Sequence, residues 1–170
     1  TSEAYIKEYG ADIVRLWVAS QDFRNDIVVS ADRVKKVGET YRGIRNAFRY
    51  QLSNLFDFDP SVNRVAAADL STIDRWILFR LDELTAQVVE AYEKYEFHLV
   101  VQTIHHFCAV DMGAFYLDII KDRQYTMAKD SLGRRSAQTA LHHIVHALVR
   151  WVAPILCFTA DEIFEHLNGE

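Results

Sequence analysis

The longest uninterrupted helical pattern in the chain, residues 30–56, constrains its fold more than any other feature. Large apolar side chains recur in it at spacings of three and four residues, which places them on one face of an α-helix. They are Val34, Val37, Tyr41, Ile44, Phe48 and Leu55. Ser30 stands where the start of such a helix would be capped. The pattern therefore predicts one long helix that begins after Ser30 and ends near Phe56.

Helical patterns also fill most of the remaining chain. Helices are predicted over residues 3–9, 12–20, 71–95, 97–120, 141–153 and 159–169. Gly10 ends the first of them, Pro154 ends or kinks the fifth, and Asn168-Gly169 ends the last. Residues 71–74 and 159–162 resemble capping boxes. Residues 57–69 and 121–135 are polar connections. The helix over 97–120 carries an apolar stripe formed by Phe97, Val101, Ile104, Cys108, Phe115 and Ile119.

The composition agrees with a helical fold that has a real core. Of 170 residues, only two are proline and six are glycine, while 50% are hydrophobic. These values favour helices over a turn-rich β fold and argue against disorder. We therefore predict an all-α protein, an antiparallel bundle of four long helices with short helices at both ends.

A row of basic side chains follows the long helix predicted over residues 30–56. Arg42, Arg45 and Arg49 are three and four residues apart, and Lys35 lies one heptad earlier. Guanidinium groups can hold phosphates or bases, and neighbouring aromatic rings can stack on bases, so the row suits an RNA loop. A solvated face interleaved with carboxylates is the alternative.

A second basic group, with Lys121 and Arg123, follows a core helix. It ends in Gln124 and Tyr125. Such residues either complement the negative end of the helix dipole or form a polar cluster that reads RNA. The pattern alone leaves both interpretations open.

Charge and composition exclude several classes of protein. A net charge of −5 argues against a protein that coats nucleic acid non-specifically. No apolar run approaches the ~18 residues of a membrane span, and no signal segment opens the chain. Cys108 and Cys157 are expected to be buried, reduced thiols of a cytoplasmic protein. The chain begins at Thr1 directly in helical sequence, so we expect a piece of a longer protein.

No motif supports catalysis or a cofactor within the chain. Phosphate-binding glycine loops and the G-x-S-x-G elbow of serine hydrolases are both absent. His142 and His146 are four residues apart, and His105, His106 and Cys108 lie one helix earlier. However, zinc-protease helices carry a glutamate after the first histidine, and here His143 stands there. We expect helix contacts from these residues and no metal site.

Several segments together resemble one family, the isoleucyl-tRNA synthetases. Residues 10–20, GADIVRLWVAS, resemble the GADILRLWVAS element that follows the KMSKS loop of these class I enzymes. Residues 22–27, DFRNDI, are similar to their DYRNDI connector, with Phe23 in place of tyrosine. The segments YRGIRNAFRY, IDRW, FYLDIIKDRQYT, ALVRWVAPIL and FTADEIF also have counterparts there in the same order. The resemblance covers nearly the whole chain and favours a bacterial form.

The resemblance implies an anticodon-binding helical bundle that is not catalytic by itself. It assigns residues 1–29 to a connector after the catalytic domain and residues 30–170 to the bundle. Its partners would be the anticodon stem-loop of isoleucine tRNA and the catalytic domain of the same chain, in a cytoplasmic monomer. The whole enzyme would charge that tRNA with isoleucine, using ATP with Mg²⁺. Many members add a C-terminal zinc module, whose cysteines are absent here.

The resemblance also implies particular RNA contacts. The helix with Tyr41, Arg42, Arg45 and Arg49 matches the one that faces the anticodon in this subclass. Tyr41 and Arg45 would lie nearest the bases, and Arg42 and Arg49 would lie on phosphates. Further candidates are Lys35, Lys121 and Arg123. The alternative function is a helical protein-interaction domain whose arginine row is only solvated.

Overall fold

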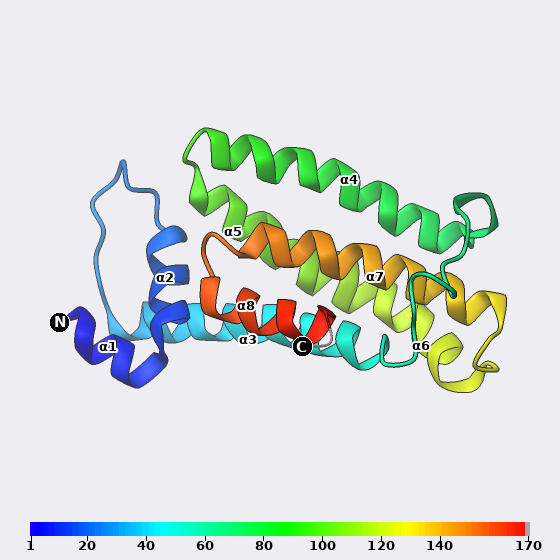
Figure 1. Cartoon of the computed structure of the whole chain (residues 1–170). Coiled ribbons are helices and arrows are strands. Elements are labelled where there is room, and N and C mark those ends of the chain that lie inside the picture. Colours follow the sequence, from blue (N-terminus) through cyan, green and yellow to red (C-terminus); the bar gives the residue numbers. More distant parts are fainter. Residues whose placement is uncertain (169–170) are drawn as a thin grey trace.

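Four long helical stretches lie side by side and alternate in direction, as Figure 1 shows for the computed structural model. The structure describes residues 1–168. The stretches are α3 (Ala31–Ser53), α4 (Thr72–Glu93), α7 (Leu132–Val152), and the continuous run of α5 (Phe97–His106), η2 (Phe107–Tyr116) and α6 (Leu117–Thr126). Since no strand occurs in the described residues, the prediction of an all-α bundle is confirmed.

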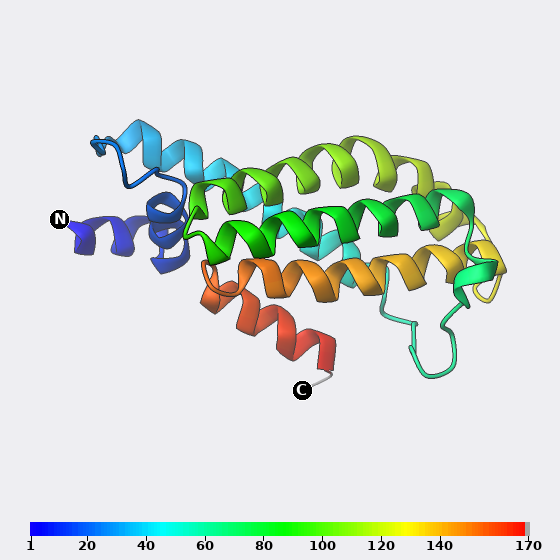
Figure 2. The same cartoon turned by 90° about the horizontal axis from the view of Figure 1, so that it is seen from above.

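Short elements complete the fold at the ends of the bundle. Helices α1 (Ser2–Tyr9) and α2 (Ala11–Ala19) lie at one end of the bundle (Figure 1). The 3₁₀ turn η1 (Ala67–Asp69) lies in the loop at the other end. Helix α8 (Cys157–Asn168) turns back beside α3 and leaves α7 at an angle, which Figure 2 shows from above. The predicted end of α8 at Gly169 lies outside the described residues.

The core is centred on α7, which is buried on most of its circumference. Leu148 and Trp151 of α7 are buried, with 0% and 4% of their surface exposed. They pack in one continuous cluster with Phe48 of α3 and Ile77 of α4. Because α7 packs against α3, α4, α5 and α6, it contacts all three of the other stretches.

The third long stretch contains ten residues of π-helix, η2, between its two α-helical parts. A π turn holds more residues than an α turn, so it rotates the residues that follow around the helix axis. Met112, Tyr116 and Ile120 are fully buried, whereas Phe115 and Ile119 are about 45% exposed. The predicted stripe through Phe115 and Ile119 is therefore wrong for this half of the helix.

Helix α2 ties the first part of the chain to the last. The Asp12 carboxylate accepts hydrogen bonds from the backbone N–H and the hydroxyl of Thr159, at 2.7 and 2.6 Å. Arg15 donates to the carbonyls of Pro154 and Ile155. Asp12 thus meets the positive end of α8, and Arg15 binds the turn that joins α7 to α8. The predicted capping box at 159–162 is wrong, because α8 begins at Cys157 and Asp12 supplies the acceptor.

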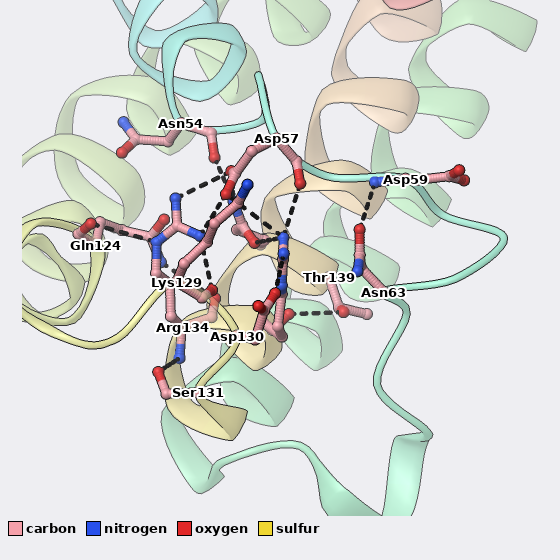
Figure 3. A network of polar contacts seen from close by, with 12 residues as sticks. Asn54, Asp57, Asp59, Asn63, Gln124, Lys129, Asp130, Ser131, Arg134 and Thr139 are labelled. Carbon is pink, nitrogen blue, oxygen red and sulfur yellow. Dashed lines mark hydrogen bonds and ion pairs between the residues drawn. The ribbon is translucent and has the colours of Figure 1, made fainter.

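A buried polar network joins the loop after α3 to the start of α7 (Figure 3). Both oxygens of Asp57 accept hydrogen bonds from Arg134, at 2.8 and 3.0 Å. Gln138 donates to Asp57 and to the Asn54 carbonyl. The predicted polar break over 121–135 is partly wrong, because α6 extends to Thr126 and α7 begins at Leu132. The arginines of this segment are therefore helical and hold the loop in place.

No helix within residues 1–168 combines the length and the apolar character that crossing a membrane requires.

Candidate nucleic-acid interface

A groove runs between α3 and α8 and encloses about 560 Å³. One wall is α3, which contributes Arg42, Arg45, Asn46 and Arg49 together with apolar side chains below them. The other wall is α8, which contributes Thr159, Glu162, Ile163 and His166. Helical spacing explains the first wall, because residues 42, 45, 46 and 49 are three or four positions apart and therefore share one face of α3. The groove is therefore lined by basic residues on one side.

The three arginines of the groove have exposed side chains. Among residues 1–168, no side chain or carbonyl accepts a hydrogen bond from the guanidinium of Arg42, Arg45 or Arg49, and no carboxylate lies within 4.0 Å of them. This distinguishes them from Arg134, whose guanidinium is fully engaged with Asp57. The guanidinium groups therefore remain available to an anionic ligand.

Tyr41 does not line the groove itself but lies beside it and is half-buried. Its hydroxyl is 2.8 Å from the hydroxyl of Thr159, which in turn is bonded to Asp12. Tyr41 lines a smaller hollow of about 330 Å³ that shares Thr159 and Glu162 with the main groove. The structure therefore brings three of the seven predicted residues together in the groove, Arg42, Arg45 and Arg49, and places Tyr41 in the adjoining hollow.

The other three predicted residues lie outside the groove. Lys35 is exposed on α3, two turns before Arg42. Lys121 is exposed on α6 and forms an ion pair with Asp118 at 2.6 Å. Arg123 is mostly covered, and its guanidinium donates to both oxygens of Asp74 at 3.0 Å and to the Gly133 carbonyl. These bonds use the guanidinium of Arg123 inside the protein. Its contact with RNA stays a prediction.

The histidines of α7 form a cluster on the surface. The rings of His142 and His146 are 4.4 Å apart, and Phe58 lies 5.5 Å from His142. Burial, helped by the neighbouring His146, His143 and Arg64, lowers the pKa of His142 to about 4. No group of three or more His, Cys, Asp or Glu side chains within residues 1–168 is arranged to hold a metal ion. The ring packing instead joins α7 to the loop after α3.

Both cysteines are free thiols. Cys108 is buried in the core, and this burial raises its pKa to about 12, so it stays protonated and unreactive. Cys157 at the start of α8 is only partly buried, which corrects the expectation that both thiols are buried.

Sequence reasoning missed the wall of the groove that α8 provides. Glu162 and His166 are one helical turn apart and line the groove, yet residues 159–162 were interpreted only as a helix start. Their spacing marks a common face of α8. Nothing local in the sequence indicates that this face lies opposite the arginines, because the packing of α8 on α3 joins residues more than 100 positions apart.

Comparisons with known proteins find relatives of this chain. Residues 74–170 match the family model described as the anticodon-binding domain of tRNA ligase. The chain is 57% identical over 161 residues to an isoleucine–tRNA ligase of Nitrosococcus oceani, which covers 95% of the chain. Ligases with the same name from Teredinibacter turnerae and Legionella pneumophila are 55% and 53% identical and cover 97% and 96% of it. The chain spans 17–18% of the length of these relatives.

Proposed function

The chain belongs to the family of anticodon-binding domains of tRNA ligases, and from this premise we propose that it binds the anticodon stem-loop of an isoleucine tRNA. The observation that carries the proposal is the groove between α3 and α8, in which Arg42, Arg45 and Arg49 are exposed and unpaired among the described residues. A groove with free guanidinium groups is suited to the phosphates and base edges of a single-stranded loop.

The groove supplies two kinds of contact. Arg42 and Arg49 would hold phosphates, which fixes the position of the loop without reading its sequence. Arg45 and Tyr41 would meet the splayed bases, with donors at their edges and a ring against a face. Because α3 is one rigid helix of 23 residues packed along the core, the contacts keep fixed spacings relative to the rest of the protein.

The rest of the reaction is proposed to lie outside this chain. In the whole ligase, residues 1–29 would connect the bundle to a catalytic domain that charges tRNA with isoleucine, using ATP and Mg²⁺. A C-terminal zinc module, where present, would also lie outside. We propose that the protein is a cytoplasmic monomer, with two free cysteines that suit a reducing compartment.

Equilibrium binding at several salt concentrations tests the proposal. The chain should bind isoleucine tRNA more tightly than a tRNA with a different anticodon. Each phosphate contact should contribute about −0.7 to the slope of log affinity against log salt. Arg49→Ala should weaken all tRNAs alike and make the slope shallower by about one such unit. Arg45→Ala should weaken the isoleucine tRNA most.

Lys36→Ala provides the matched control. Lys36 is an exposed cation of α3 that does not line the groove, so its removal changes the net charge equally but should leave the anticodon preference unchanged. If Arg45→Ala, Arg49→Ala and Lys36→Ala all bind as the wild type does, the row is only solvated. A helical protein-interaction domain then becomes the better interpretation.

A further inference from the structure

We infer that Glu162 determines which nucleobase the groove accepts, an inference that rests on the proposed function. Glu162 lies on α8 and lines both the groove and the hollow beside Tyr41. Its side chain is exposed. Within residues 1–168 its carboxylate accepts no hydrogen bond and forms no ion pair, although three arginines line the opposite wall. The carboxylate and the arginines can thus both bind a ligand that enters the groove.

The negative charge of Glu162 acts against phosphate. A groove that bound only the RNA backbone would gain from cations on both walls, because every phosphate repels a nearby carboxylate. An unpaired carboxylate opposite the arginines therefore keeps phosphates on the α3 side. Such repulsion of the wrong group is a common source of specificity. The α8 side is left for the uncharged parts of the RNA, which are its bases and riboses.

The chemistry of a carboxylate also selects among bases. An ionised carboxylate only accepts hydrogen bonds, so among the base edges Glu162 can bind only those that present N–H donors. Guanine has two neighbouring donors, N1–H and the N2 amino group, which match the two carboxylate oxygens. The neighbouring O6 atom of guanine is an acceptor, so it can receive a hydrogen bond from an arginine guanidinium. The other bases present one donor group on this edge. Glu162 together with Arg45 across the groove is therefore complementary to guanine.

The test compares three proteins on three RNAs. The proteins are the wild-type chain, Glu162→Gln and Glu165→Gln. Glu165 is an exposed carboxylate of the same helix that does not line the groove, so this control removes the same charge. The RNAs are an isoleucine anticodon stem-loop with guanine at one position of the anticodon, and the same stem-loop with inosine or adenine at that anticodon position. Inosine lacks only the 2-amino group. The dissociation constants are measured at one fixed salt concentration.

The wild type and Glu165→Gln should prefer guanine over adenine by about five-fold or more, with inosine between them. Glu162→Gln should lose this preference and bind the adenine loop at least as tightly as the wild type does, because the repulsion of phosphate is gone. A merely structural residue would instead weaken all three RNAs alike. That result, or an unchanged preference in Glu162→Gln, would overturn the inference.

The same measurement separates this inference from the proposed function. A wild-type chain that binds the loops without preferring guanine overturns the role of Glu162 and leaves anticodon binding intact. A wild-type chain that binds none of the loops overturns both.

Discussion

At the residue scale, one buried carboxylate organises the meeting point of α4, η2, α6 and α7. Asp74 has no exposed surface and accepts hydrogen bonds from Arg123, Tyr116 and Ser136 at 3.0, 2.6 and 2.6 Å. Burial by itself raises the pKa of Asp74, but the bonds from Arg123, Ser136, Ser71 and Tyr116 outweigh it and lower the pKa below its ordinary value. The carboxylate is therefore ionised and balances the charge of Arg123.

Replacing Asp74 with alanine should destabilise the protein by about 3–5 kcal/mol, because it leaves the covered guanidinium of Arg123 without its counter-charge. Asp118→Ala is the matched control. It also removes an aspartate that pairs with a cation, but the Asp118–Lys121 pair is exposed and screened, so stability should hardly change. Urea unfolding measures both variants. Equal losses would mean that the Asp74 network contributes no more than a surface ion pair.

The same residues show where sequence reasoning stops. The arginine row of α3 was predicted because its spacing lies within one helix. The pairing of Arg123 with Asp74, 49 positions earlier, has no such local signal. The position of Glu162 in the same groove as the arginines has no local signal either, because it depends on how α8 packs on α3. Local patterns indicate which residues share a face but not which distant residue meets that face.

At the element scale, the π-helical segment η2 decides which face of the third stretch is buried. Its pattern of apolar residues could not be assigned from sequence, because a stripe read at α-helical spacing continues through Phe115 and Ile119. The positions and directions of most helices were predictable, since their apolar stripes and glycine or proline ends are local signals. The π segment has no comparable local signal. Where it occurs, the α-helical spacing no longer predicts burial.

Two glycines that lie within helices should respond oppositely to alanine. A Cβ on Gly113 in η2 would lie 2.9 Å from the backbone carbonyl oxygen of Cys108, so Gly113→Ala should destabilise by about 1–3 kcal/mol. A Cβ on Gly43 in α3 meets nothing within 4 Å. Gly43→Ala should therefore stabilise by about 0.5–1 kcal/mol, through lower chain entropy in the unfolded state. Thermal or urea unfolding distinguishes the two. If both stabilise, η2 accepts a side chain and its tight turn is not required.

At the scale of the whole molecule, acid should weaken the protein in two stages. The pKa of His142 is lowered from 6.5 to about 4 in the folded state, so the unfolded chain binds a proton first. The stability that comes from keeping His142 neutral is present above pH 6.5 and is lost as the pH falls to 4. Hydrogen bonds from Arg134, reinforced by Gln138 and the charge of Arg135, lower the pKa of Asp57 from 3.8 to about 2 despite the opposing effect of its burial. The second loss therefore lies between pH 3.8 and 2.

Denaturant unfolding at pH values from 8 to 2 measures both stages. His142→Gln should flatten the upper stage, whereas His105→Gln, which changes an exposed histidine, should leave it unchanged. Asp57→Asn should flatten the lower stage, although it also lowers stability at neutral pH. A stability that stays constant from pH 6.5 to 4 in the wild type would contradict the assignment of His142.

The hydrogen bonds between α2 and residues 154–159 can form only late during synthesis of the chain. Asp12 and its partner Thr159 are separated by 147 residues. A ribosome adds about 5–20 residues per second, so roughly 7 to 30 s pass between the synthesis of the two. Asp12 therefore lacks its partner in α8 until the end of this interval, although α2 can already pack against α3. The groove beside Tyr41 takes its final shape only after α8, which forms one of its walls, has been made.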